Sequence, residues 1–362
     1  MKVCVVGAGN AGSAYACKTS LEGHDVTLLK TSDAIHEEHF KATRSRGGMT
    51  MRDVDGSEVF VPLRKMTRDP QEAFAENFDA ILILTQTTRH NAVAAALRST
   101  NARAKALLVA PGYLGSTIFR RELGDRCAIY AEGESLAYDA RIEEPGVVRI
   151  CFKNYRNALG FIDPESIDEG LALAAGLVDT YQYARANVVD SALRNPNLIL
   201  HTLGCLVSAS RIEYSGGDFW MYREAFTPSV WRLVDALDAE KMRVQEAFGG
   251  LPTPYLRDCA FRSDPDPNVE QMESFLRYAR DGGPKGPSAL DTRYLTEDVP
   301  CGLGLLVSLG ASVGIPTPVA DAAITLAGAL LGRDLHANIR SLDCLGFDSA
   351  ASLRRFCNIY NA

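Results

Sequence analysis

A run of glycines near the start of the chain constrains its fold more than any other stretch. Residues 3–6 are apolar and mostly β-branched, residues 13–21 have helical character, and between them lies Gly7-Ala8-Gly9-Asn10-Ala11-Gly12. In a G-x-G-x-x-G loop between strand and helix, the first glycine makes a tight turn, the second lets a pyrophosphate approach the backbone, and the third lets helix and strand pack closely. The phosphates then lie at the positive N-terminus of the helix. We predict that this loop binds a dinucleotide, with contacts from Gly7, Gly9, Asn10, Ala11 and Gly12; the alternative is a glycine turn with a structural role alone.

The end of the next expected strand, residues 25–29, bears on the choice between NAD and NADP. In NAD enzymes a carboxylate at this place hydrogen-bonds the ribose 2′-hydroxyl, and it would repel the 2′-phosphate of NADP. Here the strand is followed by Lys30, Thr31 and Ser32, and the first acid, Asp33, comes later. A base and two small hydroxyls favour NADP, while Asp33 leaves NAD possible. The structural alternative is that Lys30 is a solvated strand end and that the two hydroxyls cap the next helix.

Three later apolar runs are typical of parallel strands buried on both faces of a sheet, at residues 79–85, 106–110 and 127–131. In an open α/β sheet, ligands lie at the carboxyl ends of such strands, next to the point where the strand order reverses. We therefore expect Thr85 to line the nicotinamide side of the site. Residues 48–63 predict a β-hairpin, and residues 138–163 predict an antiparallel extension of the sheet.

The pattern changes near residue 186, where the strand signals end. Beyond it, helical periodicity or unbroken apolar helical runs occur at residues 193–211, 229–248, 270–280, 302–313 and 319–331. A chain of 362 residues is long enough for two domains, each with a sizeable core. The predicted fold class is α/β plus all-α. A doubly wound, Rossmann-type dinucleotide-binding sheet over residues 1–186 precedes an all-helical catalytic and substrate domain over residues 187–362.

Charge and cysteine content narrow the possible partners. A formal net charge of −7 argues against nucleic acid, whose phosphate backbone requires a basic face. We see no targeting leader and no apolar run of about 18 residues that could span a bilayer. The nine cysteines are scattered, without a C-x-x-C pair, and lie mostly in apolar segments. We therefore expect a cytoplasmic protein with reduced cysteines, no metal site, no membrane partner and small-molecule substrates.

The helix expected to follow Asn195 carries an informative polar side chain. Asn195 is a good N-cap, and Pro196 suits the first helical position. The residues that follow are apolar on nearly every face, so the helix should be buried. His201 lies within it. Its imidazole is either a core group bonded to a carbonyl or the general acid/base of a hydride transfer, because imidazole titrates near neutral pH.

A second polar segment, residues 291–300, contains Arg293 and Asp298. Taken singly, Asp298 suits a helix cap and Arg293 a surface base. Together they offer a carboxylate that can orient and charge-stabilise a histidine, and a guanidinium that can hold a substrate carboxylate at two points.

These motifs resemble those of the opine dehydrogenase family, of the octopine and nopaline dehydrogenase type. The resemblance covers essentially the whole chain and rests on residues 7–12, the Asn195-Pro-Asn197 helix start with His201, residues 231–249 with Asp238-Ala-Glu-Lys, and above all Arg293-Tyr-Leu-Thr-Glu-Asp-Val-Pro300. It implies that His201 is the catalytic acid/base, that Asp298 is its carboxylate partner, and that Arg293 binds the carboxylate of a 2-oxo acid. It also implies that Asn197 helps to orient substrate and, less directly, that Glu132 meets the incoming amino acid. The sequence departs from the family pattern at Ala11, where glycine is frequent, and at Cys301, where an aromatic residue is expected.

The reaction implied by the resemblance is reversible and NAD(P)-dependent, and residues 30–32 favour NADP(H) as its cofactor, with NAD possible. An amino acid and a 2-oxo acid condense to an imine, and a hydride is delivered to its carbon. Two alternatives remain. A ketone reductase of the 2-dehydropantoate reductase type would rely on a lysine, and Lys241, in the core helices, falls in a surface-like run; a catalytically silent NADP-binding sensor would need no buried histidine. The long apolar helices at residues 302–313 and 319–331 also suggest a homodimer.

Overall fold

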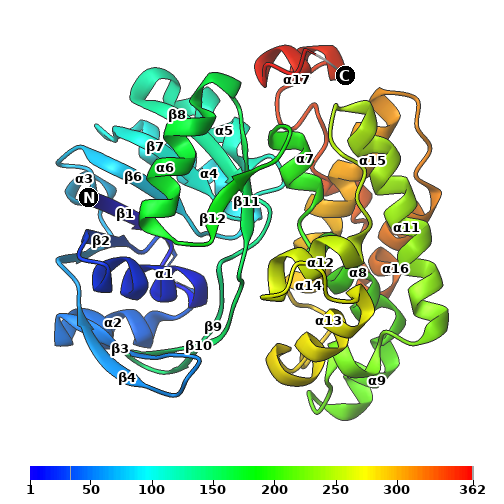
Figure 1. Ribbon diagram of the computed structural model, residues 1–362, viewed down its shortest axis with the longest axis horizontal. Coiled ribbons are helices and arrows are strands. Elements are labelled where there is room, and N and C mark those ends of the chain that lie inside the picture. Colours follow the sequence, from blue (N-terminus) through cyan, green and yellow to red (C-terminus); the bar gives the residue numbers. More distant parts are fainter. Residues whose placement is uncertain (33, 361–362) are drawn as a thin grey trace. The chain divides into compact units, whose positions relative to one another are not determined.

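The computed structural model describes residues 1–32 and 34–360, so Asp33 lies outside the described residues. The chain forms two compact units, Met1–Ala184 and Arg185–Ala362 (Figure 1). The division between them lies close to the boundary expected at residue 186. Among the described residues, no helix combines the length and the apolar character that crossing a membrane requires.

The first unit is built on an eight-stranded sheet with the order β12-β11-β8-β7-β6-β1-β2-β5 (Figure 1). Its strands are β1 (Lys2–Val6), β2 (Asp25–Leu29), β5 (Lys65–Thr67), β6 (Phe78–Ile83), β7 (Ala104–Val109), β8 (Cys127–Gly133), β11 (Asn157–Phe161) and β12 (Tyr181–Ala184). All neighbours from β5 to β8 pair in parallel. Counted in chain order, these six strands follow 3-2-1-4-5-6, the order of a doubly wound dinucleotide-binding sheet. The predicted fold class is confirmed for this unit, and the strand order reverses between β1 and β6.

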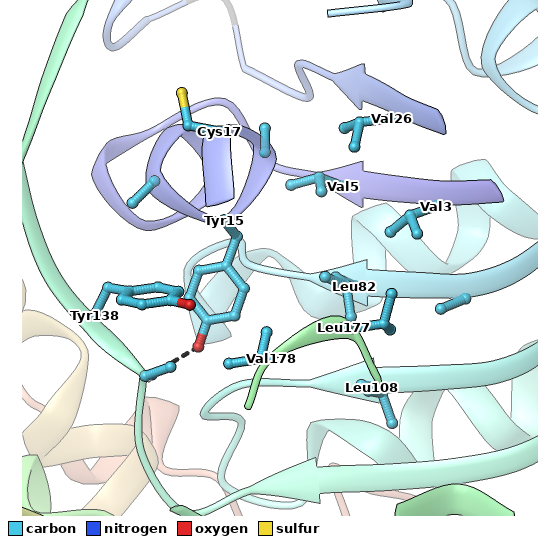
Figure 2. Close-up of a cluster of buried hydrophobic side chains, with 14 of the residues drawn as sticks. Val3, Val5, Tyr15, Cys17, Val26, Leu82, Leu108, Tyr138, Leu177 and Val178 are labelled. Carbon is cyan, nitrogen blue, oxygen red and sulfur yellow. Dashed lines mark hydrogen bonds between the residues drawn. The ribbon is translucent and has the colours of Figure 1, made fainter. Parts of the chain in front are cut away.

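Helices connect these strands and cover the sheet. They are α1 (Asn10–Leu21), α2 (Glu37–Arg46), α3 (Pro70–Ala73), α4 (His90–Arg98), α5 (Gly115–Leu123) and α6 (Ile167–Leu177). Figure 2 shows Tyr15 of α1 in the apolar cluster formed with Val5 of β1 and Leu82 of β6. The Tyr15 hydroxyl accepts the Ala137 amide at 2.7 Å and bonds the Tyr181 hydroxyl at 2.7 Å. A buried tyrosine whose hydroxyl is satisfied on both sides fixes α1, and with it the glycine loop at its start.

A second sheet corrects the expectation for the first part of residues 138–163. Here β9 (Tyr138–Glu144) and β10 (Val147–Lys153) pair antiparallel, as expected, but they belong to a four-stranded sheet with the order β4-β3-β10-β9. Its other members, β3 (Gly48–Arg52) and β4 (Glu58–Pro62), are the predicted hairpin, which is confirmed. The last part of the segment, β11, does extend the main sheet as expected, antiparallel to β8. β10 pairs in parallel with the edge of β3 and not with the main sheet. The two strands are about a hundred residues apart in the chain, so no local pattern reveals their pairing.

The described part of the second unit is helical (Figure 1). Its helices are α7 (Val188–Leu193), α8 (Asn197–Val207), α9 (Ala209–Ser215), α10 (Met221–Glu224), α11 (Pro228–Ala247), α12 (Tyr255–Ser263), α13 (Gln271–Arg277), α14 (Arg293–Thr296), α15 (Gly304–Ser312), α16 (Pro318–Leu331) and α17 (Ala350–Phe356). A π-helical segment, η5 (Asp298–Leu303), leads directly into α15. The five expected helical stretches correspond to α8, α11, α13, α15 and α16, so the all-helical second domain is confirmed.

A buried ion network fixes the turn that precedes α8. Arg194 Nε lies 2.8 Å from Asp190 Oδ1, and Arg194 Nη1 lies 2.7 Å from both carboxylate oxygens of Asp258. Buried charges persist only when they are paired in this way, since an uncompensated one costs several kcal/mol. The next residue, Asn195, accepts the Asn197 amide on its side-chain oxygen at 3.1 Å. The helix therefore begins at Asn197, slightly later than expected, although Asn195 bonds the backbone as an N-cap side chain does.

Candidate active site

Close backbone contacts require glycine in the loop between β1 and α1. Gly7 has a φ of +116°, and a Cβ added there would lie 2.7 Å from the Leu84 carbonyl oxygen. A Cβ at Gly12 would lie 1.7 Å from the Gly7 carbonyl oxygen. Because the N-cap of α1 is Gly9, no cap side chain covers the amides of the first turn, which begins with Asn10, Ala11 and Gly12. This cradle suits a pyrophosphate.

The groups next to the loop also fit a dinucleotide. Thr85 follows β6, with its Cγ2 atom 3.2 Å from the place where a Cβ on Gly7 would be. Among the described residues its hydroxyl oxygen is buried without a hydrogen-bond partner. A ligand on the cradle would be placed to supply the missing bond. The side chain of Asn10 plays a different part, since its oxygen accepts the Ile142 amide at 2.9 Å and ties α1 to β9.

Lys30, directly after β2, is not the solvated strand end that the structural alternative expects. Lys30 is only 3% exposed, and its Nζ donates to the Ile35 carbonyl at 2.6 Å. Thr31 is exposed and Ser32 is half-buried. The Ser32 hydroxyl accepts the Ala34 amide at 3.2 Å, which closes a short turn rather than capping α2. The acid that left NAD possible, Asp33, lies outside the described residues.

A buried histidine–aspartate pair lies in the second unit. His201 Nδ1 is 2.7 Å from Asp298 Oδ2, and the two side chains are 7% and 4% exposed. His201 stands in α8, every residue of which from Leu198 to Cys205 is buried, as the apolar pattern predicts. Asp298 is the first residue of η5, which packs on α8. The two side chains, 97 residues apart in the chain, are therefore brought into a charge-assisted hydrogen bond.

Two tyrosines lie next to the imidazole. The Tyr222 hydroxyl lies 3.3 Å from His201 Nε2. The centroid of the Tyr294 ring lies 3.9 Å from the centroid of the imidazole. Neither was predicted as a site residue. Tyr294 could have been found, because it directly follows Arg293 in the most specific motif. Tyr222 stands in the short helix α10, and no motif in the sequence singles it out.

The remaining predicted substrate contacts are placed as follows. Arg293 is exposed at the first position of α14, directly before Tyr294. Asn197 is half-buried at the start of α8, one turn before His201. Asn197 thus lies in the same helix as His201, and Arg293 lies in the helix that precedes Asp298.

Glu132, at the end of β8 in the first unit, has a different environment. It is fully buried, and its two carboxylate oxygens accept the amides of Leu114 at 2.8 Å and Ser116 at 3.0 Å. These bonds hold the loop before α5, where Tyr113 and Leu114 have φ values of +47° and +65°. Non-glycine residues rarely adopt such a conformation and keep it only when their surroundings hold them there. The contacts support a positioning role, and a direct contact with an amino acid substrate stays a prediction.

The description of the Asp238-Ala-Glu-Lys run as surface-like is wrong. Lys241 is 2% exposed, with its Nζ 2.5 Å from Asp238 Oδ1 and 3.3 Å from the Thr253 carbonyl oxygen. Glu240 accepts the amides of Val319 and Ala320 and so caps α16. The run looks exposed because charged residues are usually solvated, whereas here Lys241 pairs with Asp238 of its own helix and Glu240 bonds the start of α16.

Family models match both units. Residues 184–331 match the NAD/NADP octopine/nopaline dehydrogenase alpha-helical domain, and residues 3–125 match ketopantoate reductase PanE/ApbA. The first description names NAD and NADP and the second names a reductase, in agreement with the strand order and the glycine cradle. The chain is therefore an NAD(P)-dependent oxidoreductase.

Individual relatives narrow the class. An opine dehydrogenase of Arthrobacter sp. (strain 1C) is 31% identical over 97% of this chain and 97% of its own. A structure of octopine dehydrogenase in complex with NADH and agmatine superposes with a TM-score of 0.76 at 18% identity, covering 100% of this chain and 99% of that one. A structure of yersinopine dehydrogenase with NADP+ bound gives a TM-score of 0.68 at 14% identity, covering 99% and 97%. The chain belongs to the opine dehydrogenase family, which acts on CH–NH groups, as the resemblance predicted.

Proposed function

We propose that this protein is an NADP(H)-dependent opine dehydrogenase that joins an amino acid to a 2-oxo acid. The amine and the keto group condense to an imine with loss of water. Reduction of the protonated imine consumes one NADPH and leaves an N-(1-carboxyalkyl) amino acid and NADP+. The observation that carries the proposal is the buried His201–Asp298 pair at 2.7 Å in a chain of this family.

His201 is the general acid/base in this proposal. With Asp298 accepting from Nδ1–H, the neutral imidazole has its lone pair on Nε2, and Nε2 is the atom that exchanges a proton with substrate. The carboxylate also stabilises the imidazolium that forms when Nε2 takes a proton. The Tyr222 hydroxyl, 3.3 Å from Nε2, can donate to that lone pair before substrate arrives.

Three further residues hold the substrates. Arg293 offers a planar fork that suits the carboxylate of the 2-oxo acid. Asn197 supplies an amide at the start of the same helix as His201, and it orients the condensing groups. Glu132 holds the loop before α5 with its carboxylate, and we expect it to meet the incoming amino acid.

The cofactor lies on the glycine cradle, with Gly7, Gly9, Asn10, Ala11, Gly12 and Thr85 beside it. When bound, the dinucleotide supplies the hydride for the imine carbon. Lys30 brings a positive charge to the end of β2, and Thr31 and Ser32 add hydroxyls, which together favour the 2′-phosphate of NADP. NAD remains the second choice.

A screen of NADPH oxidation over pairs of amino acids and 2-oxo acids tests this function. Each component alone is the control, and His201→Ala is the matched inactive variant. The proposal requires that at least one pair is consumed while neither component alone supports oxidation. NADPH oxidation with a 2-oxo acid alone would instead favour a ketone reductase, the class of the family that residues 3–125 match.

A further inference from the structure

His36 stands beside the glycine cradle, although no sequence motif points to it. A Cβ added to Gly9 would lie 3.5 Å from His36 Cδ2 and 3.8 Å from His36 Nε2. The imidazole edge therefore faces the glycine at which a pyrophosphate approaches the backbone. His36 is also the N-cap residue of α2 and has a φ of +54° and a ψ of +33°, a left-handed conformation that is uncommon outside glycine and recurs at functional sites.

The charged groups around His36 come from three segments. Lys30 follows β2, and Glu37 and the buried His39 stand on α2. Arg68 follows β5, forms an ion pair with Glu37 and, like Lys30, lies over the Phe40 ring. Among these described groups, Lys30 and Arg68 are positive and Glu37 is negative, so the net charge is +1. Their sign suits an anion.

Protonation of the free imidazole is disfavoured. Burial, and to a smaller extent the charge of Lys30, lowers the pKa of His36 below its usual 6.5. Burial also lowers the pKa of His39 to about 4, so His39 is neutral near pH 7. A phosphate next to His36 would reverse this balance, because a nearby negative charge favours the imidazolium, which can then donate to a phosphate oxygen.

We propose that His36 is a cofactor-binding residue whose imidazole hydrogen-bonds a phosphate group of the dinucleotide beside Gly9. This rests on dinucleotide binding and not on the proposed substrates. Binding then takes up a proton, and affinity rises as pH falls from the pKa of His36 in the complex towards its lower pKa in the free protein. The phosphate is either the pyrophosphate, which NADH and NADPH share, or the 2′-phosphate of NADPH.

Calorimetry tests the proposal without turnover. NADPH and NADH are titrated into the full-length protein at pH 7 in two buffers of different ionisation enthalpy, and the difference gives the protons taken up. The test variant is His36→Asn, because asparagine tolerates the left-handed conformation and does not titrate. The control variant is His336→Gln, which alters an exposed histidine of the second unit. Thermal melts of both variants establish that they fold.

We expect proton uptake of up to one per NADPH in the wild type and in His336→Gln, and its loss in His36→Asn together with a roughly tenfold weaker affinity. Uptake with NADPH alone assigns the 2′-phosphate, and equal uptake with NADH assigns the pyrophosphate. A free 2′-phosphate, with a pKa of about 6, would release a proton on binding, which has the opposite sign. Absence of uptake in the wild type, or undiminished uptake in folded His36→Asn, overturns the proposal. Uptake without any opine product would leave it standing and count against the proposed reaction alone.

Discussion

The double substitution of His201 and Asp298 probes the proposed chemistry most deeply. The pair is nearly inaccessible to solvent, and its 2.7 Å separation is that of a charge-assisted hydrogen bond. Such bonds contribute about 1.5–3 kcal/mol, so Asp298→Asn should lower kcat roughly 10- to 100-fold. General acid/base assistance is worth about 10²–10⁴-fold, which sets the loss expected for His201→Ala. Because the imidazolium loses its counter-charge, the pH–rate profile of Asp298→Asn should move to lower pH.

The assay is steady-state NADPH oxidation at saturating amino acid and 2-oxo acid, with the NADPH dissociation constant measured separately by fluorescence. NADPH binding should stay near the wild-type value in all variants. The double variant should lose little more than His201→Ala alone, since groups that serve one step are strongly non-additive. Asp291→Asn is the matched control, because Asp291 is an exposed acid of the same segment, paired with Arg333. Losses in the double variant equal to the product of the single losses would refute the dyad and leave Asp298 a structural residue.

Three other substitutions give independent checks. Arg293→Lys should raise the KM for the 2-oxo acid much more than the KM for NADPH, since a point charge replaces a planar fork, and an unchanged oxo-acid KM would remove Arg293 from the site. Lys30→Met, which keeps the buried stem but removes the charge, should reduce the NADPH-to-NADH affinity ratio; equal affinities in the wild type would contradict the assignment of NADP. Burial lowers the pKa of His39 to about 4, so the unfolded chain binds the extra proton between pH 6.5 and 4. In urea unfolding, the free energy of unfolding should therefore fall by up to about 3 kcal/mol as pH is lowered from 6.5 to 4. His39→Gln should flatten this pH dependence, and an unchanged dependence in the variant would contradict the role given to His39.

Local chemistry explains which parts of this fold could be predicted. The glycine loop, the buried parallel strands and the apolar helices each carry their own periodicity, and the structure has them where the sequence placed them. The pairing of β10 with β3 could not be foreseen, because it depends on an edge contributed by a strand far away in the chain. Lys241 and Lys30 look solvated in sequence for another reason: their partners, Asp238 and the Ile35 carbonyl, are close in the chain, but the packing that buries both lysines is not visible in a local pattern.

The candidate site was predicted to a similar extent and for the same reason. His201 and Asp298 were paired by resemblance to a family, since nothing in their separation of 97 residues brings them together. Tyr222 was missed because a hydroxyl 21 residues from His201, on a four-residue helix, has no spacing that marks it. His36 was missed because its proximity to Gly9 depends on the loop before α2, whose conformation depends on a left-handed residue.

The fate of the hydride distinguishes an opine dehydrogenase from a ketone reductase. The protein is incubated with NADPH deuterated at C4 of the nicotinamide, an amino acid and a 2-oxo acid that are active in the screen, and the products are resolved by mass spectrometry and NMR. An opine dehydrogenase should place a single deuterium in an N-(1-carboxyalkyl) amino acid, on the former keto carbon that now bears the nitrogen, and should give no product when either partner is omitted. Deuterium in a 2-hydroxy acid formed without the amino acid would contradict the proposed function.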